Sequence, residues 1–164
     1  MKLDSYSVYL RQVHDGDLPL IMAWRNIEKV FAGFYEQNSP LKWQEHINWW
    51  KSRHDREDWV VMIEEDGVQR GVGVVNVSGL GTKLPSVGIY IGEVTLWGKK
   101  IGSKAVELAV KWLSKKGYKG GQANIMKDNI ASIKMFESLG FKWVGEGREG
   151  EWLYRLAMEE EDGT

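Results

Sequence analysis

The stretch LWGKKIGSKA, residues 96–105, is the part of the chain from which the rest is best understood. It follows an apolar run that predicts a strand and opens an apolar-periodic run that predicts a helix. The first N–H groups of a helix have no helical partner and lie at the positive end of its dipole, so this junction favours an anion. Gly98 and Gly102 let the backbone approach a phosphate without a Cβ in between. Three lysines add positive charge beside the glycines: Lys99, Lys100 and Lys104. We interpret the stretch as a pyrophosphate cradle, with an ordinary strand-to-helix turn as the alternative.

Composition limits the classes of protein to which the chain can belong. Its 164 residues, 43% hydrophobic and 27% charged, are typical of one globular domain over residues 1–164 with an acidic tail at about 159–164. The net charge of −1 argues against a nucleic-acid binder, and the absence of cysteine excludes disulfides and thiolate nucleophiles. His14, His46 and His54 lack close metal-ligand spacing, so we expect no metal site. Without a signal peptide or a long apolar segment, we expect a cytoplasmic protein that does not enter a membrane.

Hydrophobic periodicity predicts an α/β (α+β) domain. Strands are expected at residues 6–13, 58–63, 70–77, 86–92, 118–126, 141–146 and 151–158. Helices are expected at residues 18–26, 43–53, 101–116 and 129–139. This order favours a mixed, mostly antiparallel sheet with helices on both faces. The two short helices after the first strand are interpreted as a lid over a pocket, and Gly88 and Gly92 as leaving room for a ligand.

Two segments together resemble a known family. VGIYI at residues 87–91, followed by WGKKIGSKA at 97–105, is similar to the pyrophosphate loop of the GNAT superfamily of acetyl-CoA-dependent N-acetyltransferases. NIASIKMFESLGF at 129–141 is similar to the family's Asn-x-x-Ser/Ala helix, which ends in Leu-Gly-Phe. The motif Trp24-Arg25-Asn26 resembles the subgroup that acetylates ribosomal-protein N-termini, aminoglycosides or nucleotide-linked amino sugars. The resemblance implies the GNAT fold, with a seven-stranded sheet and a splayed pair of parallel strands.

The chain departs from the family pattern at three positions. The family loop usually reads Gln/Arg-x-x-Gly-x-Gly/Ala, whereas Trp97 and Lys100 occupy its first and fourth positions here. Lys100 still offers its N–H, so binding of the cofactor is expected to survive. Phe136 stands where many relatives have a tyrosine that protonates the departing thiolate, and a phenylalanine cannot donate that proton.

The resemblance also implies where acetyl-CoA binds. The cofactor is expected between the strands at 86–92 and 118–126, with its pantetheine arm on the backbone of Tyr90 and Ile91 and its pyrophosphate on the amides of residues 99–103. The expected cofactor-binding residues are Tyr90, Ile91, Gly98, Lys99, Lys100, Ile101, Gly102, Ser103, Asn124, Asn129 and Ser132. For Asn129, a plain helix N-cap is an equal alternative.

The chemistry implied is attack of an amine on a thioester carbonyl. Because the chain has no cysteine, we expect direct transfer in a ternary complex, in which positioning contributes much of the rate. A backbone N–H near Ile91 is expected to polarise the carbonyl. The amine must lose a proton to a base, for which Glu93 is the first candidate and His46 the second.

The acceptor is expected to be a small amine, with an amino sugar as one form. The candidate acceptor-binding residues are aromatic walls and polar contacts: Trp24, Phe34, Trp49, Arg25, Asn26 and Asn76. A protein N-terminal amine is the alternative acceptor. A regulatory module that binds acetyl-CoA without turnover is the alternative from another class, and a homodimer stays open.

Overall fold

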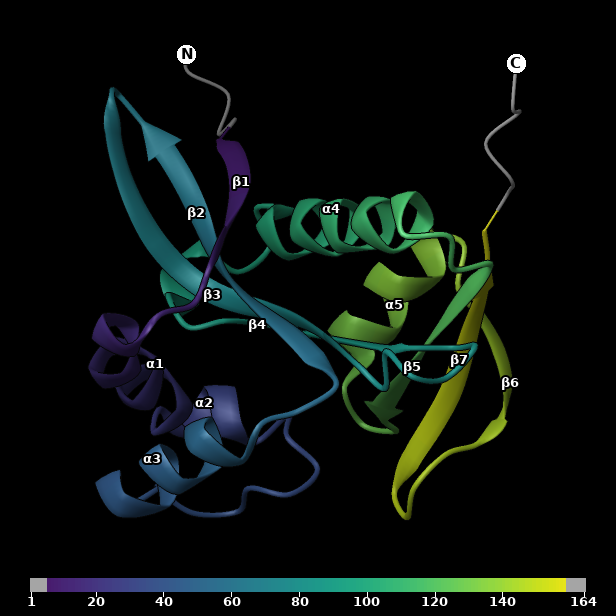
Figure 1. Ribbon diagram of the computed structural model, residues 1–164, viewed down its shortest axis with the longest axis horizontal. Helices are drawn as coiled ribbons and strands as arrows, with labels where there is room; N and C mark the ends of the chain where they lie inside the picture. The colour runs from purple at the N-terminus through teal and green to yellow at the C-terminus, as the bar shows by residue number, and fades with distance from the viewer. Residues whose placement is uncertain (1–5, 159–164) are drawn as a thin grey trace.

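The computed structural model describes residues 6–158, as seven strands, five α-helices and two 3₁₀ helices (Figure 1). The strands are β1 (Ser7–Gln12), β2 (Arg56–Glu65), β3 (Val68–Ser78), β4 (Ser86–Ile91), β5 (Gly120–Met126), β6 (Lys142–Glu146) and β7 (Glu151–Ala157). The helices are η1 (Asp15–Asp17), α1 (Leu18–Arg25), α2 (Glu28–Phe31), α3 (Trp43–Ser52), η2 (Val94–Leu96), α4 (Ile101–Lys115) and α5 (Ile130–Ser138). The acidic tail predicted at about 159–164 lies outside the described residues.

All seven strands form one sheet in the order β1-β2-β3-β4-β5-β7-β6. Every neighbouring pair is antiparallel except β4 and β5, which are parallel and share a single register pair, Ser86↔Gln122. Beyond that pair the two strands part. The predicted mixed sheet with a splayed parallel pair is therefore confirmed.

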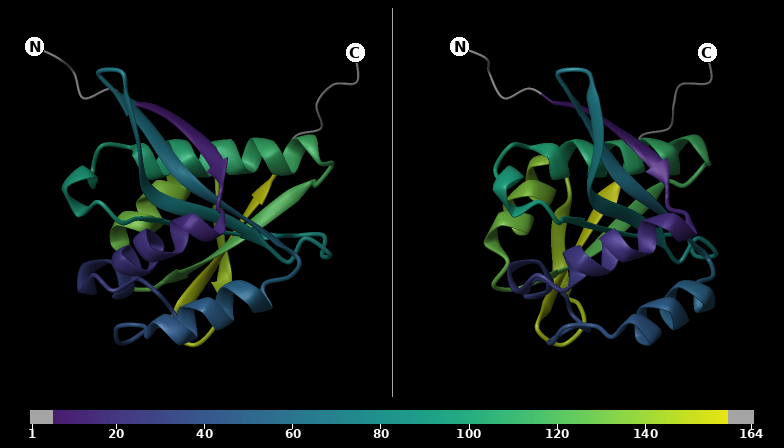
Figure 2. Two further views of the ribbon diagram at one scale, coloured as in Figure 1. Left: turned by 60° about the vertical axis from the view of Figure 1, so that its left-hand side comes forward. Right: turned by 90° about the vertical axis from the view of Figure 1, so that its left-hand side faces the viewer.

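Helices cover both faces of the sheet, as the sequence predicts. The three views show α4 on one side and α1, α2 and α3 on the other (Figures 1 and 2). The α4 side holds the larger core, in which Ala105, Ala109 and Leu113 of α4 are fully buried. A smaller core under α1 contains Ile21 and Trp24. Residues that alternate along each strand supply the two cores separately, because successive side chains point to opposite faces.

The structure differs from the sequence prediction in a few elements. β2 and β3 extend to the tip of their hairpin, where Asp66 and Gly67 both have positive φ, of 51° and 79°. Such a turn matches the right-handed twist of the flanking strands. The short helix α2 was not predicted, because four residues are too few to show helical periodicity. Among the helices of residues 6–158, none has the length and apolar character needed to cross a membrane.

Gly92 does not leave room for a ligand, contrary to the prediction. A Cβ at this position would lie 2.0 Å from Cγ of Trp24, so the glycine makes space for a buried indole. At Gly88 a Cβ would lie 3.1 Å from the amide of Asn76, which is tight but does point into the region of the cavity described below. Gly88 inside β4 and Gly92 just after it thus serve different neighbours.

Candidate active site

The loop before α4 prepares a helix N-terminus that offers several N–H groups. Gly98 has φ of 81°, and Lys100, the N-cap residue, has φ of 64° in the left-handed region. Lys104 N–H is the first to bond back across the turn, to the Lys100 carbonyl at 3.1 Å. Among the described residues, no backbone acceptor pairs with the N–H groups of Ile101, Gly102 or Ser103. These bare donors at the positive end of α4 fit the diphosphate of coenzyme A.

One cavity of about 1040 Å³ runs from this loop to the N-terminal helices. It is lined by most of the predicted cofactor residues: Tyr90, Ile91, Gly98, Lys100, Ile101, Gly102, Ser103, Asn124, Asn129 and Ser132. It is also lined by four predicted acceptor residues: Arg25, Phe34, Trp49 and Asn76. Lys99, Trp24 and Asn26 do not line it. The structure thus brings the two predicted sets of residues to one continuous space.

The end of β4 offers one main-chain edge to the split in the sheet. Gly92 N–H bonds to the Val72 carbonyl of β3 at 2.8 Å, and alternation along an antiparallel strand then turns the main-chain groups of Ile91 away from β3. The indole N–H of Trp97 donates to the Ile91 carbonyl at 2.8 Å. The carbonyl of Tyr90 faces β3 instead, since a Cβ on Gly73 would lie 2.3 Å from it. Tyr90 therefore contributes its side chain to the cavity, and Ile91 is the residue whose backbone faces the split.

The three residues of the motif Trp24-Arg25-Asn26 have different structural roles. Successive helix residues are turned by about 100°, so they face different neighbours. Trp24 is only 3% exposed and belongs to the core under α1. The Asn26 amide bonds to the backbone N–H and carbonyl of Leu41, at 2.6 and 3.1 Å, and so closes the loop after α1. Only Arg25 reaches the cavity, and Gln37 fixes its carbonyl with a 2.6 Å hydrogen bond.

Arginines and aromatic rings gather at the α1–α3 end of the cavity. Arg25 lies over the rings of Trp49 and Phe34, with its Cζ 5.1 and 6.0 Å from their centroids. Phe34 in turn meets Tyr90 edge-to-face, with centroids 5.1 Å apart. Burial raises the pKa of the Tyr90 hydroxyl well above its usual value, so it is protonated at neutral pH. We call these four residues, together with Arg56 and Asp58 below, the arginine–aromatic cluster.

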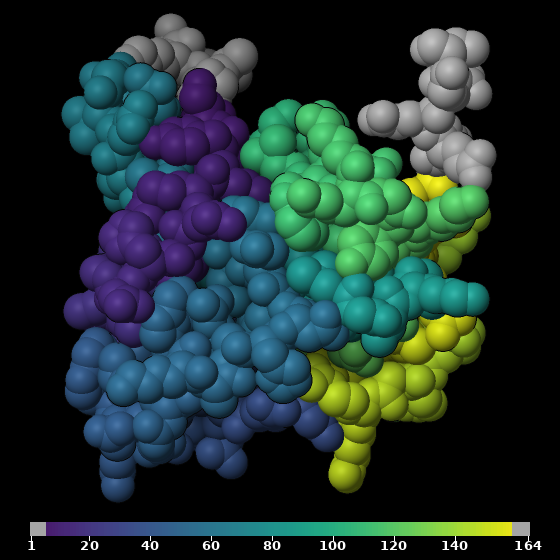
Figure 3. Space-filling model, in the orientation of Figure 1, coloured from purple at the N-terminus to yellow at the C-terminus, as the bar shows by residue number. Residues whose placement is uncertain are grey.

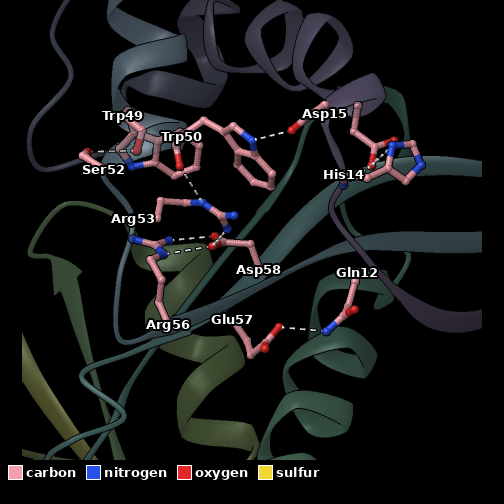
Figure 4. Close-up of polar contacts among 11 residues, drawn as sticks. Gln12, His14, Asp15, Trp49, Trp50, Ser52, Arg53, Arg56, Glu57 and Asp58 are labelled. Carbon is pink, nitrogen blue, oxygen red and sulfur yellow. Dashed lines mark hydrogen bonds and ion pairs between the residues drawn. The ribbon is translucent and has the colours of Figure 1, made fainter.

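Asp58 is a member of this cluster that the sequence analysis missed as a site residue. Its carboxylate is 4% exposed and accepts a bidentate pair from Arg56, at 2.7 and 2.9 Å, and a further bond from Arg53 at 2.5 Å (Figure 4). The sequence does contain a pattern that indicates this ion pair, because Arg56 and Asp58 lie two residues apart and therefore on one face of a strand. A buried acid at the start of an otherwise apolar strand needs a partner of opposite charge.

Neither candidate base lines the cavity. Glu93 is partly exposed, and its carboxylate lies 3.7 Å from Arg70. His46 is fully buried, with its Nε2 3.0 Å from the Leu18 carbonyl and its ring stacked on Trp49 at 5.7 Å. His46 therefore supports the wall of the cavity from behind, and the structure does not bring either side chain to the reacting space.

Two residues of the second family segment have clear local roles. The Asn129 side chain accepts a hydrogen bond from Ser132 N–H at 3.2 Å, so the N-cap alternative holds, while both residues also line the cavity. Phe136 is 3% exposed and packs edge-to-face on Phe141. Its ring lines the cavity without any group that can donate a proton.

The lining of the cavity brings together distant parts of the chain. Arg148, in the turn between β6 and β7, lies 4.1 Å from the ring of Tyr35, and both line the cavity. Glu151, 3% exposed, holds the Arg148 Nε at 2.6 Å. Figure 3 shows the helical N-terminal region bordering the C-terminal strands along the lower part of the molecule. Sequence reasoning missed this contact because no local pattern links a loop residue to a hairpin turn over a hundred positions away.

Comparison with known proteins places this geometry in a family. The model of the acetyltransferase (GNAT) domain matches residues 7–142. An uncharacterized protein of Methanocaldococcus jannaschii is 51% identical over 151 residues, which are 92% of this chain and 31% of that protein. The chain thus spans about a third of the length of this relative.

Solved structures share the fold. A crystal structure of a domain from Methanocaldococcus jannaschii has 49% identity and a TM-score of 0.91, covering 94% of this chain and 100% of that one. Spermidine N-acetyltransferase from Vibrio cholerae, in complex with CoA and spermine, has 16% identity and a TM-score of 0.76, covering 93% of this chain and 96% of that one. The second likeness shows a shared fold alone. From the family match over residues 7–142, the chain belongs to the acetyltransferase (GNAT) domain family.

Proposed function

We propose that this domain moves the acetyl group of acetyl-CoA directly to a primary amine of a small molecule. The observation that carries the proposal is the continuity of the cavity. It joins the bare N–H groups of α4, suited to a diphosphate, with a second pocket of aromatic and polar side chains on the other side of the split sheet. Two substrates that meet in one continuous cavity can be held in attack geometry, which is worth roughly 7–11 kcal/mol of barrier.

Different residues of the cavity would bind the two substrates. The first turn of α4, from Ile101 to Ser103, would hold the diphosphate, and the main chain at Ile91 would meet the pantetheine arm. Arg25, Trp49 and Phe34 would hold the acceptor. In the reaction the amine nitrogen forms a bond to the acetyl carbon as the carbon–sulfur bond breaks, the amine loses one proton and the sulfur gains one. With no cysteine in the chain, transfer needs no thiol-bound acetyl intermediate.

Release of coenzyme A tests the proposal. The purified domain is incubated with acetyl-CoA and a panel of amino sugars, polyamines, aminoglycosides and peptides, and free thiol is measured with a thiol reagent. Since the chain contains no cysteine, the protein itself gives no thiol signal. Amine-dependent thiol release is the expected result. Preference for peptides would favour the protein N-terminus as acceptor, and tight acetyl-CoA binding without release would favour a regulatory module.

Gly102 provides a matched pair of variants for the cofactor loop. A Cβ at this position would meet Met135, Ile89 and Ile91 at 3.6–3.7 Å, an ordinary contact distance. Gly102→Ala is therefore expected to fold and bind normally. The larger Gly102→Val adds two methyl groups beside Met135, Ile89 and Ile91, which all line the cavity, and so crowds the first turn of α4. We expect its affinity for coenzyme A to fall by about 100-fold, or about 2.7 kcal/mol. Unchanged affinity in titration calorimetry would show that the loop is not the cofactor site.

A further inference from the structure

Arg25 is a partly buried cation that lines the cavity, and it forms no ion pair with a carboxylate of the described residues. Among the described residues, no carboxylate lies within ion-pair distance of its guanidinium, which lies instead over the faces of Trp49 and Phe34. Burial lowers the pKa of Arg25, because loss of solvent penalises the charged form. A charge that is partly removed from water loses part of its hydration, and an oxyanion can replace what is lost. Arg25 is therefore available to pair with an anionic group of a ligand in the cavity.

The neighbouring acids do not satisfy this charge. Both oxygens of Asp58 are engaged by Arg56, and one of them also by Arg53 (Figure 4). Glu36 lines the cavity but is exposed to solvent, which screens its charge. The cluster around Asp58 thus holds three guanidinium groups against one buried carboxylate, and Arg25 is the one that carboxylate does not reach.

The position of Arg25 separates it from the phosphates of the cofactor. On β4, Ile89 and Ile91 face Gly102 at the start of α4, whereas Tyr90 faces Phe34 on the opposite side of the sheet. Arg25 lies with Phe34 and Trp49. The helices α1–α3 cover that side of the sheet (Figure 2). The diphosphate cradle and Arg25 are therefore on opposite faces of β4, so the cofactor's diphosphate does not account for this cation.

We infer that the acceptor amine carries an anionic group, a phosphate or a carboxylate, which binds to Arg25. The inference rests on the proposed acetyltransferase function and narrows its acceptor class. A planar guanidinium can bind either kind of oxyanion through two parallel hydrogen bonds. The rings of Trp49 and Phe34 orient the Arg25 guanidinium and would contact the ligand. Polycationic amines are disfavoured, because a second positive charge placed beside Arg25 is repelled in a poorly solvated site. In this respect the pocket is unsuited to a ligand such as the spermine in the Vibrio cholerae structure.

The test compares amines that differ in charge. Glucosamine, glucosamine 6-phosphate, muramic acid and spermine supply a neutral ring, a phosphate, a carboxylate and a polycation, and kcat/KM is measured for each by thiol release. We expect the better of the two anionic acceptors to exceed glucosamine and spermine by about tenfold or more, as one added charge-assisted contact implies. Comparison of glucosamine 6-phosphate with muramic acid shows whether Arg25 prefers a phosphate or a carboxylate. A preference for glucosamine or spermine overturns the inference and leaves the acetyltransferase function standing.

Substitution of Arg25 identifies the residue responsible. Arg25→Gln is expected to lower kcat/KM for the anionic acceptor by about 30-fold or more, and to lower it at least tenfold more than it lowers kcat/KM for glucosamine. Arg25→Lys keeps the charge and is expected to recover part of the loss. Arg155→Gln, at an exposed position of β7 outside the cavity, is the matched control and should change neither value. An equal loss for both acceptors would assign Arg25 a structural role and overturn the inference.

Two further measurements keep the outcomes separable. If Arg25→Gln does not fold, the wild-type protein is assayed at rising ionic strength, where the preference for the anionic acceptor must shrink; a constant preference contradicts the inference. If no amine releases thiol, the acetyltransferase proposal fails, and glucosamine 6-phosphate and glucosamine are titrated calorimetrically into the coenzyme A complex. Tighter binding of the phosphorylated sugar, lost in Arg25→Gln, would support the anion site on its own, and equal binding would overturn it.

Discussion

Lys100 shows how one residue stores strain at the cofactor loop. Its φ of 64° lies in the left-handed region, which costs a residue with a Cβ roughly 1–2 kcal/mol and glycine almost nothing. Lys100→Gly is therefore expected to raise the free energy of unfolding by about 1 kcal/mol and the melting temperature by about 2–4 °C. Thermal unfolding followed by circular dichroism checks the shift. Lys111→Gly, at an exposed site inside α4, is the control and should destabilise by about 1 kcal/mol; a loss of stability in both variants would contradict the argument.

Other residues show what single positions in the sequence can and cannot reveal. Gly102 and Ser103 were predictable as cavity residues, because their N–H groups are bare in any helix that starts there. Trp24 and Asn26 were predicted as acceptor contacts together with Arg25, but the helical turn sends one into the core and the other to the loop at Leu41. Residue type alone does not give the direction of a side chain.

The helix α3 carries a histidine whose burial makes stability depend on pH. His46 is fully buried, and burial lowers its pKa from the usual 6.5, so the folded state keeps the ring neutral. Below about pH 6.5 the imidazole takes up a proton in the unfolded chain but not yet in the folded chain. The free energy of unfolding is therefore highest above that pH and falls as the pH drops toward the folded pKa of His46. The loss is at most about 1.4 kcal/mol per pH unit.

A comparison of wild type with His46→Gln isolates this contribution. Urea unfolding at pH 7.5 and 5.0 is expected to show a larger loss of unfolding free energy in the wild type than in the variant, by about 1 kcal/mol. The other two histidines and all carboxylates are common to both proteins, so their titration cancels in the difference. Equal losses would mean that the buried ring gains its proton as readily in the folded as in the unfolded state.

Whole elements were predicted well where local chemistry determines them. The β2–β3 hairpin follows from Asp66-Gly67, and α4 follows from a wide apolar stripe that ends at Gly117. The arginine–aromatic cluster was not predicted as a unit. Its members come from α1, the loop after α2, α3, β2 and β4, and only the packing of α1–α3 on the sheet brings them together.

At the scale of the molecule, the sheet consists of two blocks that meet at one residue pair. β1 to β4 form one block and β5, β7 and β6 the other, joined only at Ser86↔Gln122. Beyond this pair β4 and β5 form no ladder with each other, and the Ile91 carbonyl accepts from Trp97 instead. A ligand between the two strands can therefore contact both edges. At a concentration of 100 times Kd, acetyl-CoA is expected to add about 2.7 kcal/mol of stability and about 5–10 °C to the melting temperature.

Amide hydrogen exchange locates this effect. Under native conditions, acetyl-CoA is expected to slow local exchange most in peptides covering residues 87–91, 98–104 and 120–126, because the ligand contacts both blocks and the start of α4. Peptides of the β1–β2 pair, at the far edge of the sheet, gain only the protection that comes from global stabilisation. Gly102→Val at the same ligand concentration is expected to be only about half occupied, so the added stability should fall to about 0.4 kcal/mol and the local protection should be much weaker. Protection that is equal in all peptides, or that appears only outside β4, β5 and α4, would mean that acetyl-CoA does not bridge the split, because a ligand seated there must close the edges it touches.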